Sequence, residues 1–203
     1  MESMPALVAI IAVATITPGP NNFIVLAAGA RGGLPSAGPL IGAVIAGGLV
    51  LIALTWAGAA LLFEAEPRLR LLLTVTGSAY LAWLGVVMIR HASSPAGTAN
   101  ELPQPDSALP RTWLGVAAFQ LFNPKAWVLV VTATAAITRN GWQGFSVLAA
   151  VFVTLSGICL ALWALVGSTI GAFLGDGRSK RCFDRAMGGL LIVSAALLIA
   201  DVV

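Results

Sequence analysis

The chain has 203 residues, of which 59% are hydrophobic and only 9% are charged. A soluble domain carries about 25% charged residues, so the composition excludes a soluble globular protein and indicates an integral membrane protein. The net charge of +3 comes from basic residues scattered along the chain rather than gathered in one segment, which excludes a nucleic-acid-binding protein.

Six apolar runs follow one another along the chain, and each approaches or exceeds the roughly 20 residues that cross a membrane as a helix. They cover residues 5–29, 37–62, 70–89, 112–137, 143–173 and 184–202. The chain begins Met1-Glu2-Ser3-Met4, without the basic segment of a cleavable signal peptide, so we expect the first run to remain as a helix. The sequence therefore predicts an all-α integral membrane protein with six transmembrane helices.

Residues 92–110 differ from the rest because they are rich in Pro, Ser and other polar residues. Such a segment cannot bury enough apolar surface to fold and is typical of a flexible linker. We expect a cytoplasmic linker here, which divides a single transporter-sized domain into two halves, residues 1–91 and 111–203, with three helices each.

Lysine and arginine are unevenly distributed between the two sets of loops. The loops after the first, third and fifth runs carry seven of these residues, which are Arg31, Arg90, Arg111, Arg178, Lys180, Arg181 and Arg185. The opposite loops carry three, which are Arg68, Arg70 and Arg139. Because basic loops stay in the cytoplasm, both termini are predicted to lie outside.

Each half opens with a run that is interrupted near its middle. The interruptions are residues 17–22, called the first break below, and residues 123–125, called the second break. With three helices in each half, a second half that repeats the first must lie upside down in the membrane, as is common in secondary transporters. The sequence therefore predicts two inverted three-helix repeats, with the first and fourth helices broken near the midplane.

Prolines cause both breaks, because a proline has no N–H and clashes with the carbonyl four residues earlier, at about 3 kcal/mol or more inside a helix. The carbonyl groups expected to lose their donors are those of Ala14, Ile16 and Gln120. A new half-helix then starts after each break, with Asn123 as N-cap before Pro124, and with Gly19 or Asn21 in that role at the first break. Such N-termini attract anions, for which a substrate carboxylate is the natural candidate.

Lys125 is the only charged residue in the middle of an apolar run. A lysine at the centre of a bilayer costs about 2.5–3.5 kcal/mol on insertion scales, so such residues face a cavity or a partner. No acidic residue lies in the middle of any run, so no carboxylate of the chain is expected to pair with it. Three hypotheses stay open: Lys125 binds a substrate carboxylate, it exchanges a proton during transport, or it bonds structurally to freed backbone carbonyls.

Four other polar residues are weaker candidates, since polar residues in membrane helices commonly bond to neighbouring helices. They are Gln120, one turn before Pro124, Thr15 and Thr17, beside Pro18, and Tyr80, the only tyrosine. The complete set of candidate pathway residues is Thr17, Pro18, Gly19, Pro20, Asn21, Asn22, Tyr80, Gln120, Asn123, Pro124 and Lys125.

Three motifs resemble those of a known family. The first is PGPN at residues 18–21, followed by glycines at positions 32, 33, 38 and 42. The second is GSAYLAWLG at residues 77–85, which is similar to the pattern GxxYLxxxG, and the third is FNPKA at residues 122–126, which is similar to an NPKA motif. In this order and at this chain length, the motifs resemble the LysE/RhtB family of amino-acid exporters.

This resemblance implies a multi-pass protein of the bacterial inner membrane that exports amino acids or close derivatives by proton exchange, without a cofactor. It also implies that seven residues of the two breaks line or shape the pathway, which are Pro18, Gly19, Pro20, Asn21, Asn123, Pro124 and Lys125. The expected partners are the amino acid, protons and the lipid bilayer, and a homo-oligomer stays open. Because the spans lack a central acidic residue, a neutral substrate such as homoserine, threonine or leucine is expected rather than lysine.

Two other functions stay open, a passive channel for small solutes and a metal-ion exporter. Water channels use opposed Asn-Pro half-helices in addition to six full spans, whereas here the breaks lie within the spans. A metal exporter would need Asp, Glu, His or Cys ligands within the spans, where Cys159 alone is available. We do not expect an enzyme, because the spans contain no cluster of catalytic side chains.

Overall fold

The structure, a computed structural model, describes residues 4–59, 61, 65–93, 112–137, 141–173 and 177–200. Its elements are α1 (Met4–Ile16), α2 (Pro20–Leu54), a π-helical turn (Thr55–Ala59), α4 (Pro67–Ser93), α5 (Trp113–Phe119), a 3-10 turn (Gln120–Phe122), α6 (Pro124–Ala135), α7 (Gly141–Phe173) and α8 (Gly177–Ala200). The all-α part of the prediction is therefore confirmed for these residues. Residues 94–110 of the expected linker lie outside the described part of the chain.

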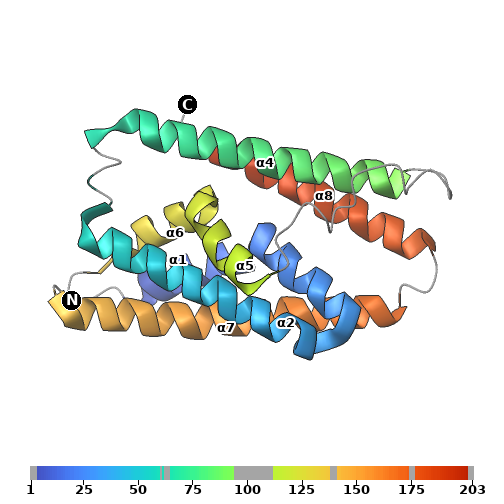
Figure 1. Ribbon diagram of the computed structural model, residues 1–203, viewed down its shortest axis with the longest axis horizontal. Coiled ribbons are helices and arrows are strands. Elements are labelled where there is room, and N and C mark those ends of the chain that lie inside the picture. The colour runs from blue at the N-terminus through green and yellow to red at the C-terminus, as the bar shows by residue number, and fades with distance from the viewer. Residues whose placement is uncertain are drawn as a thin grey trace.

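The first predicted helix is divided between α1 and α2, and the residues between them are not helical, as the prolines predict. The loop expected between the first and second helices is not present, because α2 continues through these residues and is interrupted only by a kink. The kink lies at Gly32 (φ −158°, ψ 25°) and Gly33 (φ 65°, ψ −159°), and the second conformation is nearly restricted to glycine. It separates a first arm of α2, residues 20–31, from a second arm, residues 34–54 (Figure 1).

The fourth predicted helix is also broken where expected. α5 continues into the 3-10 turn, Asn123 is extended (φ −88°, ψ 104°), and α6 begins at Pro124. The two parts are bent by 68° relative to each other. The Asn123-Pro124 sequence therefore breaks this helix at the position that the sequence predicts.

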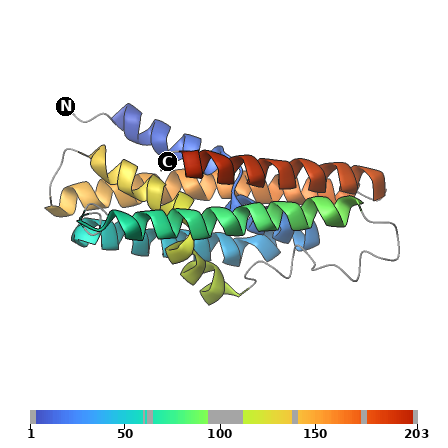
Figure 2. The ribbon, with the colours of Figure 1, turned by 90° about the horizontal axis from the view of Figure 1, so that it is seen from above.

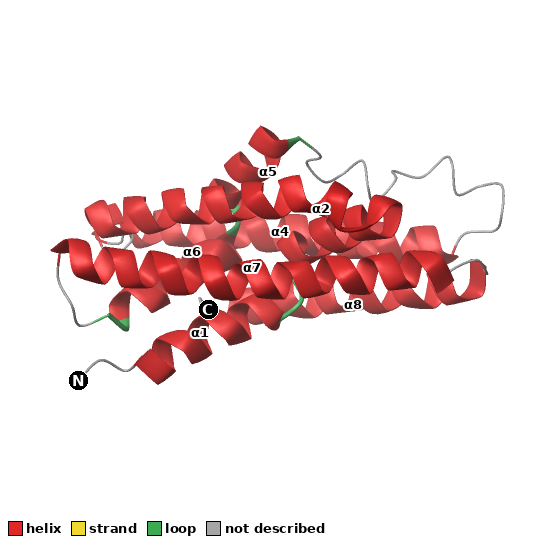
Figure 3. Ribbon diagram, turned by 90° about the horizontal axis from the view of Figure 1, so that it is seen from below, coloured by secondary structure: helices red, strands yellow, loops and turns green. Residues whose placement is uncertain are grey.

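Two pairs of long helices form the body of the bundle. α4 packs chiefly against α8, and α2 packs chiefly against α7. Figure 1 shows the α4–α8 pair above the α2 and α7 layer, with α5 and α6 lying between them. The short helices α1 and α5 project on opposite sides of the bundle (Figure 2, Figure 3).

Glycines bring helix backbones close together at the main crossings. A Cβ atom placed on Gly85 of α4 would lie 2.5 Å from the carbonyl oxygen of Gly188 on α8, and a Cβ on Gly188 would lie 2.6 Å from that of Gly85. On the first arm of α2, a Cβ on Gly29 would overlap the carbonyl of Ala164 on α7. Small residues at such positions are what lets membrane helices pack closely.

Among the described residues, four helical segments are long and apolar enough to cross a membrane, and the bent α5–α6 pair makes a fifth. One of these segments includes both arms of α2, and α1 is a shorter apolar helix of 13 residues. The predicted total of six spans therefore stays a prediction. Large apolar side chains point outward on several helices, as lipid contact requires; Val13, Leu72, Leu114 and Leu197 are 65%, 61%, 72% and 64% exposed.

Candidate functional site

The first break is held together by an asparagine side chain. Gly19 is fully extended (φ −165°, ψ 178°) and precedes the first residue of α2. Asn22, which is 4% exposed, donates from Nδ2 to the carbonyl oxygens of Thr15 at 2.9 Å and Thr17 at 3.0 Å. A side chain from the start of the new half-helix thus bonds to carbonyls that the old half-helix leaves without donors.

The second break has the N-cap that the sequence predicts. The side-chain oxygen of Asn123 accepts a hydrogen bond from the backbone N–H of Lys125 at 3.1 Å, and Pro124 is the first residue of α6. Asn123 is only 2% exposed, so this cap forms in the interior of the bundle. Such a cap offsets one of the unpaired N–H groups at a helix start, typically by about 1 kcal/mol.

Lys125 bridges the two breaks. Its Nζ donates to the carbonyl oxygen of Thr17 and, at 3.0 Å, to that of Pro18. Ser194 on α8 also donates to the Pro18 carbonyl, at 3.0 Å. Of the three hypotheses for this lysine, contact with freed carbonyls is the one present in the structure, although the carbonyls are not those of Ala14 and Ile16.

A pair of amides forms a second link between the breaks. Asn21 Nδ2 donates to Gln120 Oε1 at 3.0 Å, and Gln120 Nε2 donates to Asn21 Oδ1 at 2.9 Å. Gln120 is 1% exposed and also donates weakly to the carbonyl of Val116 at 3.3 Å. The sequence identified Gln120 only as a weak candidate, yet its side chain is fully engaged at the centre of the site.

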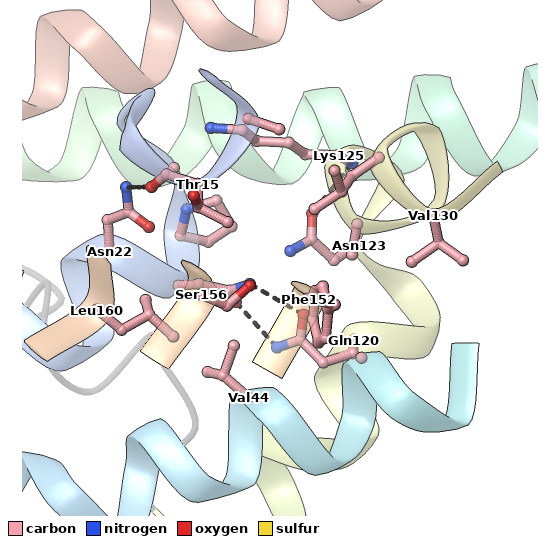
Figure 4. Close-up of a pocket in the computed structure, with 17 residues that line it drawn as sticks. Thr15, Asn22, Val44, Gln120, Asn123, Lys125, Val130, Phe152, Ser156 and Leu160 are labelled. Atoms are coloured by element: carbon pink, nitrogen blue, oxygen red, sulfur yellow. Dashed lines mark hydrogen bonds between the residues drawn. The ribbon is translucent and has the colours of Figure 1, made fainter. Parts of the chain in front are cut away.

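The two breaks enclose a cavity of about 50 Å³ (Figure 4). Its polar lining consists of Thr15, Asn21, Asn22, Gln120, Asn123, Lys125 and Ser156, and its apolar lining includes Val44, Leu129, Val130, Phe152 and Leu160. A cavity of this size has room for a few water molecules, so it must widen before it can hold an amino acid.

The structure gathers most of the predicted pathway residues around this cavity. Seven of them line it: Gly19, Pro20, Asn21, Asn22, Gln120, Asn123 and Lys125. Thr17 and Pro18 bond to the ammonium of Lys125 through their carbonyls. The remaining two, Tyr80 and Pro124, line a neighbouring cavity instead.

The neighbouring cavity lies between α4 and the second break and measures about 340 Å³. Tyr80 lines it together with Phe119, and the centroids of the two rings are 5.6 Å apart. Pro20 and Asn123 line both cavities, so the two breaks form the wall between them. Tyr80 is therefore separated by this wall from the cavity that contains Lys125.

Sequence reasoning missed several residues of the site. Ser156 and Ser194 both reach it, from α7 and α8. Hydroxyls in membrane helices commonly bond within their own helix, so their residue type alone gave no signal. The four-residue spacing of Phe152, Ser156 and Leu160 could have indicated one face of a helix, but not which way that face points.

Charge in the cavity is of one sign. Lys125 supplies the one charged side chain of the lining, and no carboxylate is among the described lining residues. The N-termini of α2 and α6 lie at the breaks and each adds a partial positive charge, whereas the C-terminal ends of α1 and of the 3-10 turn at the same breaks add partial negative charges. The ammonium of Lys125 is therefore what favours an anionic group here, with amide and hydroxyl groups available for further hydrogen bonds and an apolar wall opposite.

Comparison with known proteins adds independent information. The family described as LysE type translocator matches residues 12–201 of the chain. An uncharacterised membrane protein of Pseudomonas aeruginosa is 31% identical over 166 residues, which are 78% of this chain and 76% of that protein.

Two further relatives carry functional names. A leucine efflux protein of Enterobacter sp. is 28% identical over 196 residues, 92% of this chain and 89% of its own length. A cysteine/O-acetylserine efflux protein of Salmonella typhimurium is 29% identical over 161 residues, 76% of this chain and 77% of its own length. No solved structure matches the chain significantly.

Proposed function

Because the chain belongs to the family of LysE type translocators, we propose that it is a secondary transporter that exports amino acids or close derivatives across the bacterial inner membrane. Its helices include several that are apolar and long enough to span a bilayer. The relatives named for leucine efflux and for cysteine/O-acetylserine efflux support this class of substrate.

The observation that carries the proposal is the docking of two helix breaks against each other. Lys125 bonds to carbonyls of the first break, and Asn21 bonds to Gln120 just before the second. A membrane anchor has no need of interrupted helices, whereas transporters use half-helix ends to bind substrate and coupling ions. The pathway residues named from the sequence are proposed to act here, with Tyr80 in the adjoining cavity.

We further propose six transmembrane helices arranged as two inverted repeats, residues 1–91 and 111–203, joined by a cytoplasmic linker at residues 92–110. The contacts support this pairing. The second arm of α2 meets α5 at Gly47, where a Cβ would overlap the carbonyl of Ala117, and α7 packs against α1. Exchanging α5 with α1 and the second arm of α2 with α7 converts one contact into the other. The excess of basic residues in odd-numbered loops supports termini on the outside.

Lys125 is the proposed coupling group. In the described form its ammonium is bound by carbonyls, which are neutral acceptors. For antiport, the substrate-free form must carry a proton inward and the substrate-bound form must not carry it outward. A substrate that enters from the cytoplasm would displace the carbonyls and separate the two breaks, and Lys125 would release its proton to the cytoplasm. After the substrate leaves on the outside, Lys125 would take up a proton there, and its ammonium would bond to the carbonyls again in the closed form. A single positive charge suits a neutral amino acid such as leucine, threonine or homoserine better than lysine.

An export assay tests this function. Bacteria that carry the gene or an empty vector are fed dipeptides, and the amino acids released into the medium are measured over time. We expect faster release of one or more neutral amino acids with the gene, and release at the vector level with Asn21→Ala or Lys125→Ala. Normal release from both variants, each present in the membrane at the wild-type amount, would refute the proposed site.

A further inference from the structure

α7 places three side chains along the cavity at four-residue spacing, and they are Phe152, Ser156 and Leu160 (Figure 4). Ser156 is the polar one of the three. It is 2% exposed, and its hydroxyl has no hydrogen-bond partner. Ser146 on the same helix behaves in the usual way, because its hydroxyl donates to the carbonyl of Trp142 at 2.8 Å.

A buried hydroxyl without a partner is unfavourable, and most such groups in proteins are paired. At Ser156 the unpaired hydroxyl lines the same cavity as the Asn21–Gln120 amide pair. A ligand that enters this cavity can therefore supply the missing partner. Both the ammonium and the carboxylate of an amino acid meet this requirement, because a hydroxyl can accept and donate.

Phe152 forms the apolar side of the cavity and is 5% exposed. The ring lies directly on Gly48 of α2, where an added Cβ would be 2.6 Å from its Cε1 atom. Gly48 thus leaves the space that the ring occupies. Val44 and Val130 continue the same apolar wall, and a charged or polar side chain placed against it would be buried without a partner.

We propose that this face of α7 selects the transported amino acid. The Ser156 hydroxyl binds the polar head of the substrate, and the Phe152 ring limits the size of its side chain. The favoured class is a zwitterionic amino acid with an aliphatic side chain. This inference rests on the proposed function, since it names the specificity determinants of the same cavity.

Counterflow in liposomes tests the inference. The purified protein is reconstituted, the liposomes are loaded with alanine, and uptake of labelled alanine is measured against external alanine, valine, leucine or phenylalanine as competitor. For Phe152→Ala and Phe152→Leu, we expect phenylalanine to become a stronger competitor. Its potency relative to alanine should rise at least about tenfold over that in the wild type, in line with the size discrimination of apolar pockets. The Leu variant is the smaller change and covers the case in which the Ala variant does not fold.

Ser156→Ala should act differently. Losing one hydrogen bond to the substrate should raise the half-saturating concentration for every amino acid in the series by roughly three- to tenfold. The order of preference should stay the same, and Ser156→Thr should restore most of the affinity. Matched controls on the same helix are Ser146→Ala, whose hydroxyl bonds within α7, and Val153→Ala, which is 38% exposed on the outer face. Both should behave as wild type.

Two results would overturn the inference while leaving the proposed function intact. One is an unchanged size order in both Phe152 variants, and the other is wild-type half-saturation in Ser156→Ala, in each case with wild-type transport present. If the wild-type protein exchanges none of the amino acids, the proposed function and this inference both fail. The wild-type arm therefore separates the two kinds of failure.

Discussion

Asn21→Leu and Gln120→Met each remove one amide of a buried pair while nearly keeping the size of the side chain. The two amides exchange hydrogen bonds of 3.0 and 2.9 Å across the two breaks. Asn21→Leu leaves the Oε1 atom of Gln120 without a donor at a position that is 1% exposed. Gln120→Met leaves the amide of Asn21 without its partner. Asn21 is only half-buried, however, and its amide can turn toward other polar groups of the cavity.

These surroundings give the expected magnitudes. Leaving a buried polar group unpaired costs about 1–3 kcal/mol of stability, and Asn21→Leu should lie toward the upper end of that range because Gln120 is the more deeply buried partner. Replacing both amides by apolar groups of the same shape is close to neutral, so the double variant should lose less than about 1 kcal/mol. The double variant should therefore be more stable than the sum of the single effects predicts, by at least about 1 kcal/mol.

The assay is reversible unfolding of the purified protein in mixed detergent micelles, followed by the loss of helical circular dichroism as the denaturing detergent increases. Gln143→Met is a matched control, because Gln143 is exposed near the start of α7; its effect should stay within about 0.5 kcal/mol. The reasoning about the amide pair would be refuted if the double variant lost as much stability as the two single variants together. It would also be refuted if Asn21→Leu were as stable as the control.

Three further substitutions and one control probe other parts of the structure. Lys125→Met removes the ammonium between the breaks, so proton-driven amino-acid transport in liposomes should fall to background; transport at the wild-type rate would contradict this. Gly77→Ala places a methyl group in the ring of Pro124 and should cost about 1–3 kcal/mol, measured as a lower thermal midpoint in detergent. Gly33→Ala should cost about as much, roughly 1–3 kcal/mol, because its backbone (φ 65°, ψ −159°) is nearly restricted to glycine. Gly38→Ala, with no atom within 4 Å of the added Cβ, should leave the midpoint unchanged or raised, and a loss there equal to the other two would mean that crowding and backbone strain are not the causes.

The positions of both breaks could be predicted from the sequence because proline acts on its immediate neighbours. The missing N–H and the clash one turn back depend on no distant residue. The N-cap at Asn123 is local in the same way, since its bond reaches only to Lys125. The kink at Gly33 was harder to predict, because glycine permits an unusual backbone without requiring it.

The partners across the site could not be predicted, because they depend on how separate helices pack. Lys125 and Thr17 are 108 residues apart, and Asn21 and Gln120 are 99 apart. Nothing in the residue types distinguishes Ser156, which faces the cavity, from the serines that bond within their own helices. Tyr80 stayed in the candidate set for the same reason, since only the packing of α4 places it in the neighbouring cavity.

The pairing of α4 with α8 has a mechanical consequence. Close backbone approach at Gly85 and Gly188 holds α4 and α8 against each other, so we expect the two helices to shift together as one lever. That lever touches both breaks, because Gly77 lies against the Pro124 ring and Ser194 donates to the first break. A small displacement of the α4–α8 pair would change both contacts at once. We therefore expect the two halves of the site to loosen or tighten together.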